Sequence, residues 1–258
     1  MTRRIVVTGA GSGIGHALAT RLRHAGSEVL GVDLKGAEVQ ADLATTEGRE
    51  QAVEAARRFG DGALDALVTC AGIAGEQPHV VAVNYFGSVE LCEALRPALV
   101  QSPAPRVAVV GSISSLHPTD DQLVAACLAG DEPRAVARAT ERAEHGGGYE
   151  LYPSSKAALA RWLRRTAVAP GWADAGIALN AVAPGVVLSA MTRDLLADEA
   201  GRQLVEQAVP MPLNGHAPPD AIAALLAWLI SPDNTHVTGQ VIFADGGAEA
   251  TYRGETAW

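Results

Sequence analysis

The segment "YPSSK" contains the two side chains best suited to chemistry. Tyr152 and Lys156 are four positions apart, a spacing that places both side chains on one face of a helix. A free Tyr titrates at a pH of about 10, so its phenol needs a nearby cation to exchange a proton with an alcohol or a carbonyl near neutral pH. Lys156 can supply that charge. Tyr149 lies two helical turns from Lys156 and fits less well, and Pro153 is compatible with the first turn of a helix.

A carbonyl oxygen that gains negative charge also needs a second hydrogen-bond donor. The segment "RVAVVGSISSLHP" (106–118) follows a β-rich run with Ser112, Ser114 and Ser115. A shift of two residues keeps a side chain on the same face of a strand, so Ser114 is an alternative to Ser112. Ser115 is explained more simply as part of a serine-rich turn.

Short β-rich runs alternate with longer helical stretches along the chain, which is typical of a parallel sheet with crossover helices. Gly26 and Gly60 are predicted to terminate two of the helices. We expect strands at 4–7, 28–32, 66–69, 106–110, 177–183 and 240–244, with a short extra strand at 38–41. The sequence therefore predicts an α/β protein with one Rossmann-type domain (1–258) and a doubly wound, mostly seven-stranded parallel sheet.

One segment departs from this alternation. Residues 118–148 carry helical signals without a strand signal, are interrupted from Gly130 to Pro133, and end in three glycines. We expect a helical insertion of one or two surface helices immediately before the Tyr152 helix.

The glycine-rich segment "VTGAGSGIG" (7–15) directly follows the first expected strand and opens the first helix. Gly9, Gly13 and Gly15 allow the backbone to turn tightly and to approach a pyrophosphate, whose charge the free N–H groups of the helix terminus can bind. A flexible turn would also use glycine, but the strand before it and the helix after it favour a dinucleotide-binding loop.

An acidic residue near the end of the second strand is the next feature of such a site, because a ribose hydroxyl needs an acceptor there. Asp33 can accept from both ribose hydroxyls and would repel a 2′-phosphate. NAD is therefore the predicted cofactor and NADP is less favoured, although Lys35 and His16 leave dual use open. Asp42 could meet the adenine amino group or cap the next helix.

Taken in order, these motifs resemble the short-chain dehydrogenase/reductase family from Arg4 to about Gly247. "TGAGSGIG" resembles its cofactor motif, "YPSSK" its Tyr and Lys motif, and "CAG" (70–72) its Asn-Ala-Gly turn, with Cys70 in place of Asn. "VNYFG" (83–87), "PGVVLSAM" (184–191) and "DGG" (245–247) match further family segments. Within the family the chain looks most like the bacterial 3α-hydroxysteroid dehydrogenase/carbonyl reductase branch.

The resemblance implies a catalytic set of Asn84, Ser112, Tyr152 and Lys156. Counting the family pattern from Arg106 selects Ser112 over Ser114, and Asn84 would kink its helix and link Lys156 to solvent water. The implied cofactor-binding residues, besides Tyr152 and Lys156, are Gly9, Ser12, Gly13, Ile14, Gly15, Asp33, Leu34, Asp42, Leu43, Cys70, Ala71, Gly72, Pro184, Gly185, Val187 and Ser189. The Val187 backbone and the Ser189 hydroxyl would hold the nicotinamide carboxamide, with Ser189 where Thr is usual.

The resemblance further implies an enzyme that interconverts a secondary alcohol and a ketone with NAD(H), using Tyr152 as general acid or base. Residues 188–216 are expected to form a substrate loop rich in Leu, Val and Met, which favours an apolar or cyclic substrate. A 3α-hydroxysteroid rests on the resemblance alone, and aryl or other alcohols stay open. A non-catalytic dinucleotide-binding sensor is a separate hypothesis, which the intact reactive set disfavours, and an epimerase or dehydratase is less favoured.

Composition and charge exclude other classes. Hydrophobic residues make up 48% and charged residues 19%, as in an ordinary globular protein, and the net charge of -9 argues against a nucleic-acid partner. Three widely spaced cysteines show neither a disulfide framework nor a metal-ligand pattern. Because no signal peptide or membrane-spanning run is found, we expect a cytoplasmic protein with a small-molecule substrate and no membrane partner.

The position of the insertion also bears on assembly. A homodimer or a homotetramer is typical of the family that the chain resembles. In relatives the helix that carries the reactive Tyr commonly packs into a tetramer interface. An insertion directly before that helix therefore favours a dimer or an altered assembly.

Overall fold

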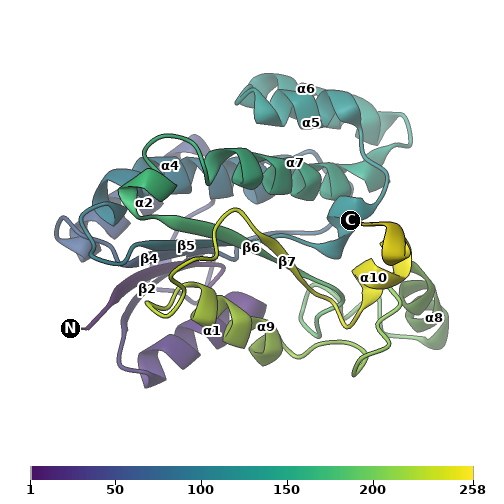
Figure 1. Cartoon of the computed structure of the whole chain (residues 1–258). Coiled ribbons are helices and arrows are strands. Elements are labelled where there is room, and N and C mark those ends of the chain that lie inside the picture. Colours follow the sequence, from purple (N-terminus) through teal and green to yellow (C-terminus); the bar gives the residue numbers. More distant parts are fainter. Residues whose placement is uncertain (1, 258) are drawn as a thin grey trace.

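The computed structural model describes residues 2–257, and a single twisted sheet forms its centre, with helices on both faces (Figure 1). All seven strands are parallel, in the order β3-β2-β1-β4-β5-β6-β7. The strands are β1 (Arg4–Thr8), β2 (Glu28–Asp33), β3 (Val39–Gln40), β4 (Ala66–Thr69), β5 (Arg106–Val110), β6 (Ala178–Pro184) and β7 (Val241–Ala244). This arrangement confirms the predicted doubly wound Rossmann-type fold.

The helices form two layers around the sheet. Helices α2 (Thr46–Gly60), α4 (Gly87–Leu99) and α7 (Leu151–Thr166) cover one face, and α1 (Gly13–His24) and α9 (Pro219–Leu229) cover the other (Figure 1). The short α3 (His79–Val81) leads into α4, while α8 (Glu199–Ala208) and α10 (Ala248–Arg253) lie beside the edge at which the strands end. Among residues 2–257, no helix has the length and apolar character needed to cross a membrane.

Two cores result from the alternation of side chains along the strands. In β1, Val6 is buried with Leu91 of α4 and Leu159 of α7, whereas its neighbour Val7 is buried with Leu18 of α1 on the opposite face. The apolar runs that predict strands therefore supply both faces of a fully covered parallel sheet.

The two predicted helix stops behave differently. Gly26 follows α1 with φ +85°, as expected for a residue that ends a helix. Gly60 is instead the last residue of α2, and Asp61 takes the left-handed conformation with φ +46°. A Cβ at Gly60 would lie only 2.9 Å from the Leu64 side chain, so the absence of a side chain serves packing here.

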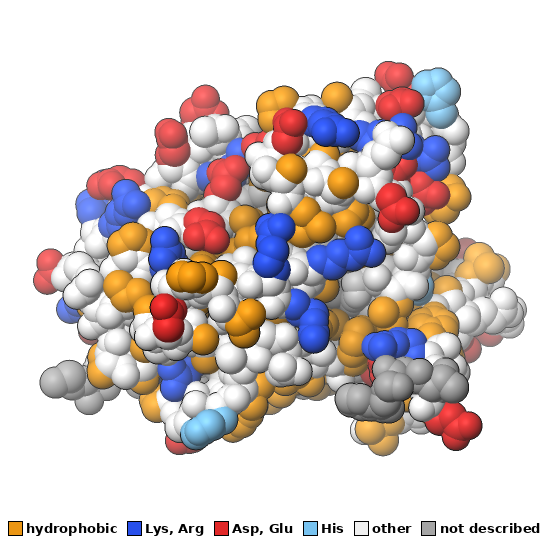
Figure 2. All heavy atoms as spheres, turned by 45° about the horizontal axis from the view of Figure 1, so that its top comes forward, with side chains coloured by type: hydrophobic (Ala, Val, Ile, Leu, Met, Phe, Trp, Pro, Cys, Tyr) orange, Lys and Arg blue, Asp and Glu red, His pale blue; other side chains and the backbone are white. Residues whose placement is uncertain are grey.

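The insertion consists of two helices, α5 (Asp121–Leu128) and α6 (Glu132–Glu144), with Pro133 in the first turn of α6. Helix α5 packs on the outer side of α7, and α6 packs on α5 (Figure 1). Figure 2 shows acidic and basic side chains interspersed over the face that carries them. The structure therefore confirms the predicted surface helices before α7 and shows that there are two.

Polar contacts hold the insertion together and fix it to the rest of the fold. Asp120 caps α5 and lies 2.6 Å from Arg138 Nη2, and the hydrogen bond from Arg138 holds the pKa of Asp120 below its usual value. The Asp120 backbone N–H donates to Ser154 Oγ of α7 at 2.9 Å. At the other end of the insertion, the buried Arg49 of α2 lies 2.6 Å from Glu132.

Candidate active site

A cavity of about 810 Å³ opens at the edge where the strands end. Parallel sheets of this kind place their ligand sites at the carboxyl ends of the strands. Every residue of the predicted site except Asn84 lines this cavity: Gly9, Ser12, Gly13, Ile14, Gly15, Asp33, Leu34, Asp42, Leu43, Cys70, Ala71, Gly72, Ser112, Tyr152, Lys156, Pro184, Gly185, Val187 and Ser189. The fold thus gathers predicted residues from seven separate segments into one cavity.

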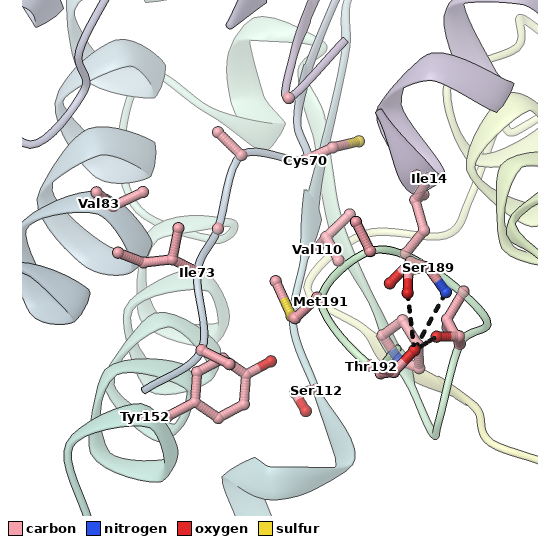
Figure 3. A pocket seen from close by; sticks show the side chains of 18 of the residues that line it. Ile14, Cys70, Ile73, Val83, Val110, Ser112, Tyr152, Ser189, Met191 and Thr192 are labelled. Atoms are coloured by element: carbon pink, nitrogen blue, oxygen red, sulfur yellow. Dashed lines mark hydrogen bonds between the residues drawn. The ribbon is translucent and has the colours of Figure 1, made fainter. Parts of the chain in front are cut away.

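Tyr152 lies in the first turn of α7, and its hydroxyl lies beside Ser112 in the cavity wall (Figure 3). Burial raises the pKa of Tyr152, while a hydrogen bond with Ser112 acts in the opposite direction. Tyr149, which shares the same region of sequence, is 60% exposed and lies outside the cavity lining. The structure therefore separates the two tyrosines as the helical spacing predicts.

Lys156 is one helical turn further along α7 and is 4% exposed. Its Nζ donates to the Val110 carbonyl oxygen at 2.9 Å and lies 5.8 Å from the centre of the Tyr152 ring. Burial lowers the pKa of Lys156 to about 8. Burial likewise raises the pKa of the Cys70 thiol to about 12, so this cavity residue stays neutral beside the ammonium.

Ser112 follows the end of β5 and holds a fixed orientation. Its Oγ accepts a hydrogen bond from the Ser114 backbone N–H at 3.1 Å and caps the short helical turn Ile113–Leu116. Ser114 is half-buried and also lines the cavity, whereas Ser115 lies outside its lining. Because only Ser112 meets Tyr152, the geometry favours it over Ser114 as the second donor.

Asn84 lies behind the cavity wall, in a π-helical turn (Ala82–Phe86) that interrupts the helical stretch between α3 and α4. Its Oδ1 accepts from the Ile73 N–H at 2.9 Å, and its Nδ2 donates to the Ile73 carbonyl oxygen at 3.0 Å. Gly72 separates Asn84 from Lys156, because a Cβ there would lie 3.2 Å from Asn84 Oδ1 and 3.4 Å from Lys156 Nζ. The link from Asn84 to Lys156 through water stays a prediction.

The glycine-rich loop is shaped by contacts that only glycine permits. Gly9 has φ +69°, and a Cβ on it would lie 2.7 Å from the Ala71 backbone nitrogen. A Cβ on Gly15 would lie 2.2 Å from the Gly9 carbonyl oxygen. The amino end of α1 at Gly13 opens into the cavity, so its backbone N–H groups are available to a bound phosphate group.

The two predicted carboxylates lie near this loop. Asp33 ends β2, where its Oδ2 accepts from the Gly11 N–H at 2.9 Å and its Oδ1 from the Leu34 N–H at 2.6 Å. Asp42 Oδ1 accepts from the Ala44 N–H at 2.9 Å, and the cap of α2 is Thr45, not Asp42. The capping alternative for Asp42 is therefore wrong, and its carboxylate lines the cavity.

The segment after β6 holds a residue that the sequence reasoning missed. Thr192 Oγ1 donates to the Val187 carbonyl oxygen at 2.6 Å and accepts from the Ser189 N–H at 3.1 Å (Figure 3). It thereby fixes both residues predicted to hold a carboxamide. A hydroxyl residue three positions after Ser189 is a turn-forming signal that could have indicated it.

The remaining wall of the cavity is apolar. Met191 lies over the space in front of Tyr152, with Ile73 and Val83 on the side of α4 (Figure 3). Further apolar lining residues are Ile113, Leu195, Leu196, Val205 and Val209. Most of these residues follow β6 and lie in or near the predicted substrate loop. The hydrophobic periodicity of the sequence gave no signal that they would line the same cavity as Ile73.

Comparisons with known proteins agree with this geometry. The "short chain dehydrogenase" family model matches residues 3–124, and the "Enoyl-(Acyl carrier protein) reductase" model matches residues 125–249. The chain belongs to the short-chain dehydrogenase/reductase family. It is accordingly an oxidoreductase that acts on CH–OH groups with a nicotinamide dinucleotide. The family recognised from the motifs is confirmed.

The similarity extends over nearly the whole chain. A 3-alpha-hydroxysteroid dehydrogenase/carbonyl reductase of Comamonas testosteroni is 37% identical, over 96% of this chain and 97% of the relative. The structure of a 3-alpha-hydroxysteroid dehydrogenase from Pseudomonas sp. B-0831, complexed with NADH, is 40% identical with a TM-score of 0.88, covering 98% of this chain and 99% of its own. A putative NAD(P)-dependent gluconate 5-dehydrogenase from Beutenbergia cavernae with bound NADP is 26% identical, with a TM-score of 0.74 and coverage of 96% and 97%.

Proposed function

We propose that this chain interconverts a secondary alcohol and a ketone with NAD(H), with Tyr152 as the general acid in reduction and the general base in oxidation. The observation that carries the proposal is the placement of the Tyr152 hydroxyl beside Ser112 in the cavity that also contains the glycine-rich loop. Two hydroxyls side by side can hold one substrate oxygen, and the Lys156 ammonium lies 5.8 Å from the centre of the Tyr152 ring.

The residues of the chain divide the work as follows. Ser112 donates to the substrate oxygen and fixes its position, and Tyr152 transfers the proton. Lys156 stays largely protonated at neutral pH, since its pKa is about 8, and its charge favours the phenolate. The glycine-rich loop would hold the phosphates of a bound dinucleotide, and Val187 and Ser189 would hold its carboxamide. When bound, the dinucleotide would supply or accept the hydride.

NAD is the proposed cofactor. The Asp33 carboxylate is held at the end of β2 by two backbone N–H groups and lines the cavity next to the loop. In that position it accepts from ribose hydroxyls and repels a 2′-phosphate. The relative from Pseudomonas sp. B-0831 is a complex with NADH, which supports NAD, while a more distant neighbour holds NADP.

The proposed substrate is an apolar or cyclic alcohol or ketone. The wall in front of Tyr152 is formed by Ile73, Val83, Met191 and neighbouring apolar side chains, which would bury a hydrocarbon framework. We assign residues 188–216 as the substrate loop. The names of the relatives from Comamonas testosteroni and Pseudomonas sp. B-0831 favour a 3α-hydroxysteroid or a related carbonyl compound.

A panel of substrates tests the proposal directly. We would follow absorbance of the reduced nicotinamide with purified protein, NAD or NADP, and 3α-hydroxysteroids, cyclic alcohols and aryl alcohols. Turnover with NAD and a cyclic or steroidal alcohol is the expected result. Turnover restricted to aryl alcohols would establish the alternative alcohol dehydrogenase, and cofactor binding without turnover across the panel would favour a dinucleotide sensor.

A further inference from the structure

Ser155 is fully buried between two parts of the candidate active site that are far apart in sequence. Its Oγ donates to the Tyr152 carbonyl oxygen at 2.7 Å and accepts from Asn84 Nδ2 at 3.2 Å. Ser155 is 0% exposed and lies outside the cavity lining. Any effect of this hydroxyl on the reaction must therefore pass through the residues that it holds.

The partner of Ser155 has a fixed orientation. Both polar ends of the Asn84 side chain bind the Ile73 backbone, and its remaining N–H group is the one that meets Ser155. Ile73 directly follows the Cys70–Gly72 turn in the cavity wall. A continuous set of hydrogen bonds thus runs from this wall, through Asn84 and Ser155, to the backbone of Tyr152.

The first turn of α7 needs such support. The N–H groups of the first turn of a helix have no intrahelical partner, so this turn lacks part of the hydrogen bonding that stabilises the middle. The extra bond at the Tyr152 carbonyl oxygen fixes the residue whose phenol must meet the substrate. Reactive groups lose activity when they move by a fraction of an ångström to one ångström.

We propose that Ser155 is a positioning residue for Tyr152, which it locks to the Asn84 turn through its hydroxyl. This inference rests on the proposed function of Tyr152 as general acid and base. Alanine at position 155 would keep the helix, because alanine is the best helix former. It would release the link to the Tyr152 backbone and leave one N–H of Asn84 Nδ2 without its partner. The chemical step should slow while the dinucleotide loop, more distant along the chain, keeps its affinity.

The neighbouring Ser154 provides a matched control. It is also 0% exposed and on α7, but its Oγ accepts from the Asp120 N–H of the insertion at 2.9 Å. Ser154→Ala leaves that buried N–H without its partner and should lower the melting temperature. It should leave kcat unchanged, because Ser154 holds the insertion and not Tyr152.

The test compares Ser155→Ala, Ser154→Ala, Ser155→Thr and Tyr152→Phe in alcohol oxidation with NAD. We expect Ser155→Ala to lower kcat about tenfold, to leave the KM for NAD unchanged, and to move the acid limb of the kcat profile to higher pH. Ser155→Thr, which keeps the hydroxyl, should restore most of the loss. Thermal unfolding of each variant separates these effects from stability.

The outcomes distinguish the inference from the function on which it rests. If Tyr152→Phe is inactive and Ser155→Ala matches Ser154→Ala in kcat and pH profile, the role of Ser155 is overturned while the function stands. If Tyr152→Phe retains turnover, the assignment of Tyr152 fails and the inference falls with it. Should Ser155→Thr unfold, the comparison of the two alanine variants still decides the matter.

Discussion

Lys156 Nζ lies 5.8 Å from the centre of the Tyr152 ring and donates its hydrogen bond to the Val110 carbonyl oxygen at 2.9 Å. The ammonium is therefore anchored to the end of β5, where its charge can act on the Tyr152 ring. Burial opposes ionisation of both groups, since it raises the pKa of Tyr152 and lowers the pKa of Lys156 to about 8. The Tyr152 phenolate and the Lys156 ammonium are each unfavourable alone in this buried site, and each charge stabilises the opposite one.

The buried Lys156 gives a prediction for stability. Its pKa falls from 10.5 in the unfolded chain to about 8, so below pH 8 the folded state carries a penalty of about 3 kcal/mol, which is lost as pH rises toward 10.5. Replacing Lys156 removes this penalty, but it also removes the hydrogen bond to Val110, which cancels about 1 kcal/mol of the gain in stability. Lys156→Met should therefore raise the free energy of unfolding by about 2 kcal/mol at pH 7 while abolishing turnover.

Denaturant unfolding at pH 7 and pH 10.5 checks the sign. The gain from Lys156→Met should shrink at the higher pH, because Lys is then neutral in the folded protein. Arg164→Met, at an exposed position of the same helix, serves as the control and should show no such change. A gain that is equal at both pH values would contradict the charge argument.

Asp33 gives a prediction for cofactor choice. Asp33→Asn removes the charge but keeps an oxygen that can accept from the Gly11 N–H. We expect the ratio of kcat/KM for NAD to that for NADP to fall at least about tenfold, as for loss of a charged hydrogen bond. Asp42→Asn is the comparison, and it should weaken both dinucleotides alike. If the ratio stays the same in Asp33→Asn, the Asp33 charge is not the basis of the NAD preference.

Gly9 gives a prediction for the loop. Gly9 and Gly26 both have positive φ, +69° and +85°, but only at Gly9 would a Cβ meet backbone, 2.7 Å from Ala71. Gly26→Ala should lower the free energy of unfolding by about 1 kcal/mol, because of backbone conformation alone. Gly9→Ala should lower the free energy of unfolding by more than this, as measured by thermal unfolding. It should also abolish NAD binding, as measured by fluorescence titration. Equal losses of stability in the two variants would show that the close approach of Gly9 to the Ala71 backbone is unimportant.

The strands could be predicted to within one or two residues, because each is a short apolar run with polar or glycine boundaries. Val39–Gln40 is shorter than expected, and β6 starts and ends one residue later than expected. The reactive pair could be predicted because its spacing lies within one helix. Strand order, in contrast, depends on pairings between distant segments that no local pattern specifies.

Parts of the site were beyond prediction for the same reason. The partners of Asn84 are 11 and 71 residues away, so only the resemblance indicated the kink, and nothing indicated Ser155. Thr45 was overlooked as the cap of α2, although a threonine at the start of a helix is a strong local signal. No local pattern indicated Arg49, which binds Glu132 of the insertion, or Arg138, which binds Asp120 within it.

The insertion gives a prediction for assembly. Helix α5 packs on the outer side of α7, and α6 packs on α5 (Figure 1). The ion pair between Arg49 of α2 and Glu132 of α6 and the bond from the Asp120 N–H to Ser154 hold them there. A second copy of the chain could not pack on that side of α7 without displacing them. Sedimentation equilibrium should therefore report a homodimer. A tetramer whose interfaces leave the insertion ordered and free would contradict this expectation.

The most direct test of the central claim compares Tyr152→Phe with Tyr149→Phe. Both lose one phenol hydroxyl from the same region, but only Tyr152 lines the cavity beside Ser112. With NAD and the best alcohol of the panel, Tyr152→Phe should lower kcat at least about a hundredfold with NAD binding retained, and Tyr149→Phe should match the unmodified chain. Turnover that survives in Tyr152→Phe, or is lost in Tyr149→Phe, would contradict the assignment of the acid and base.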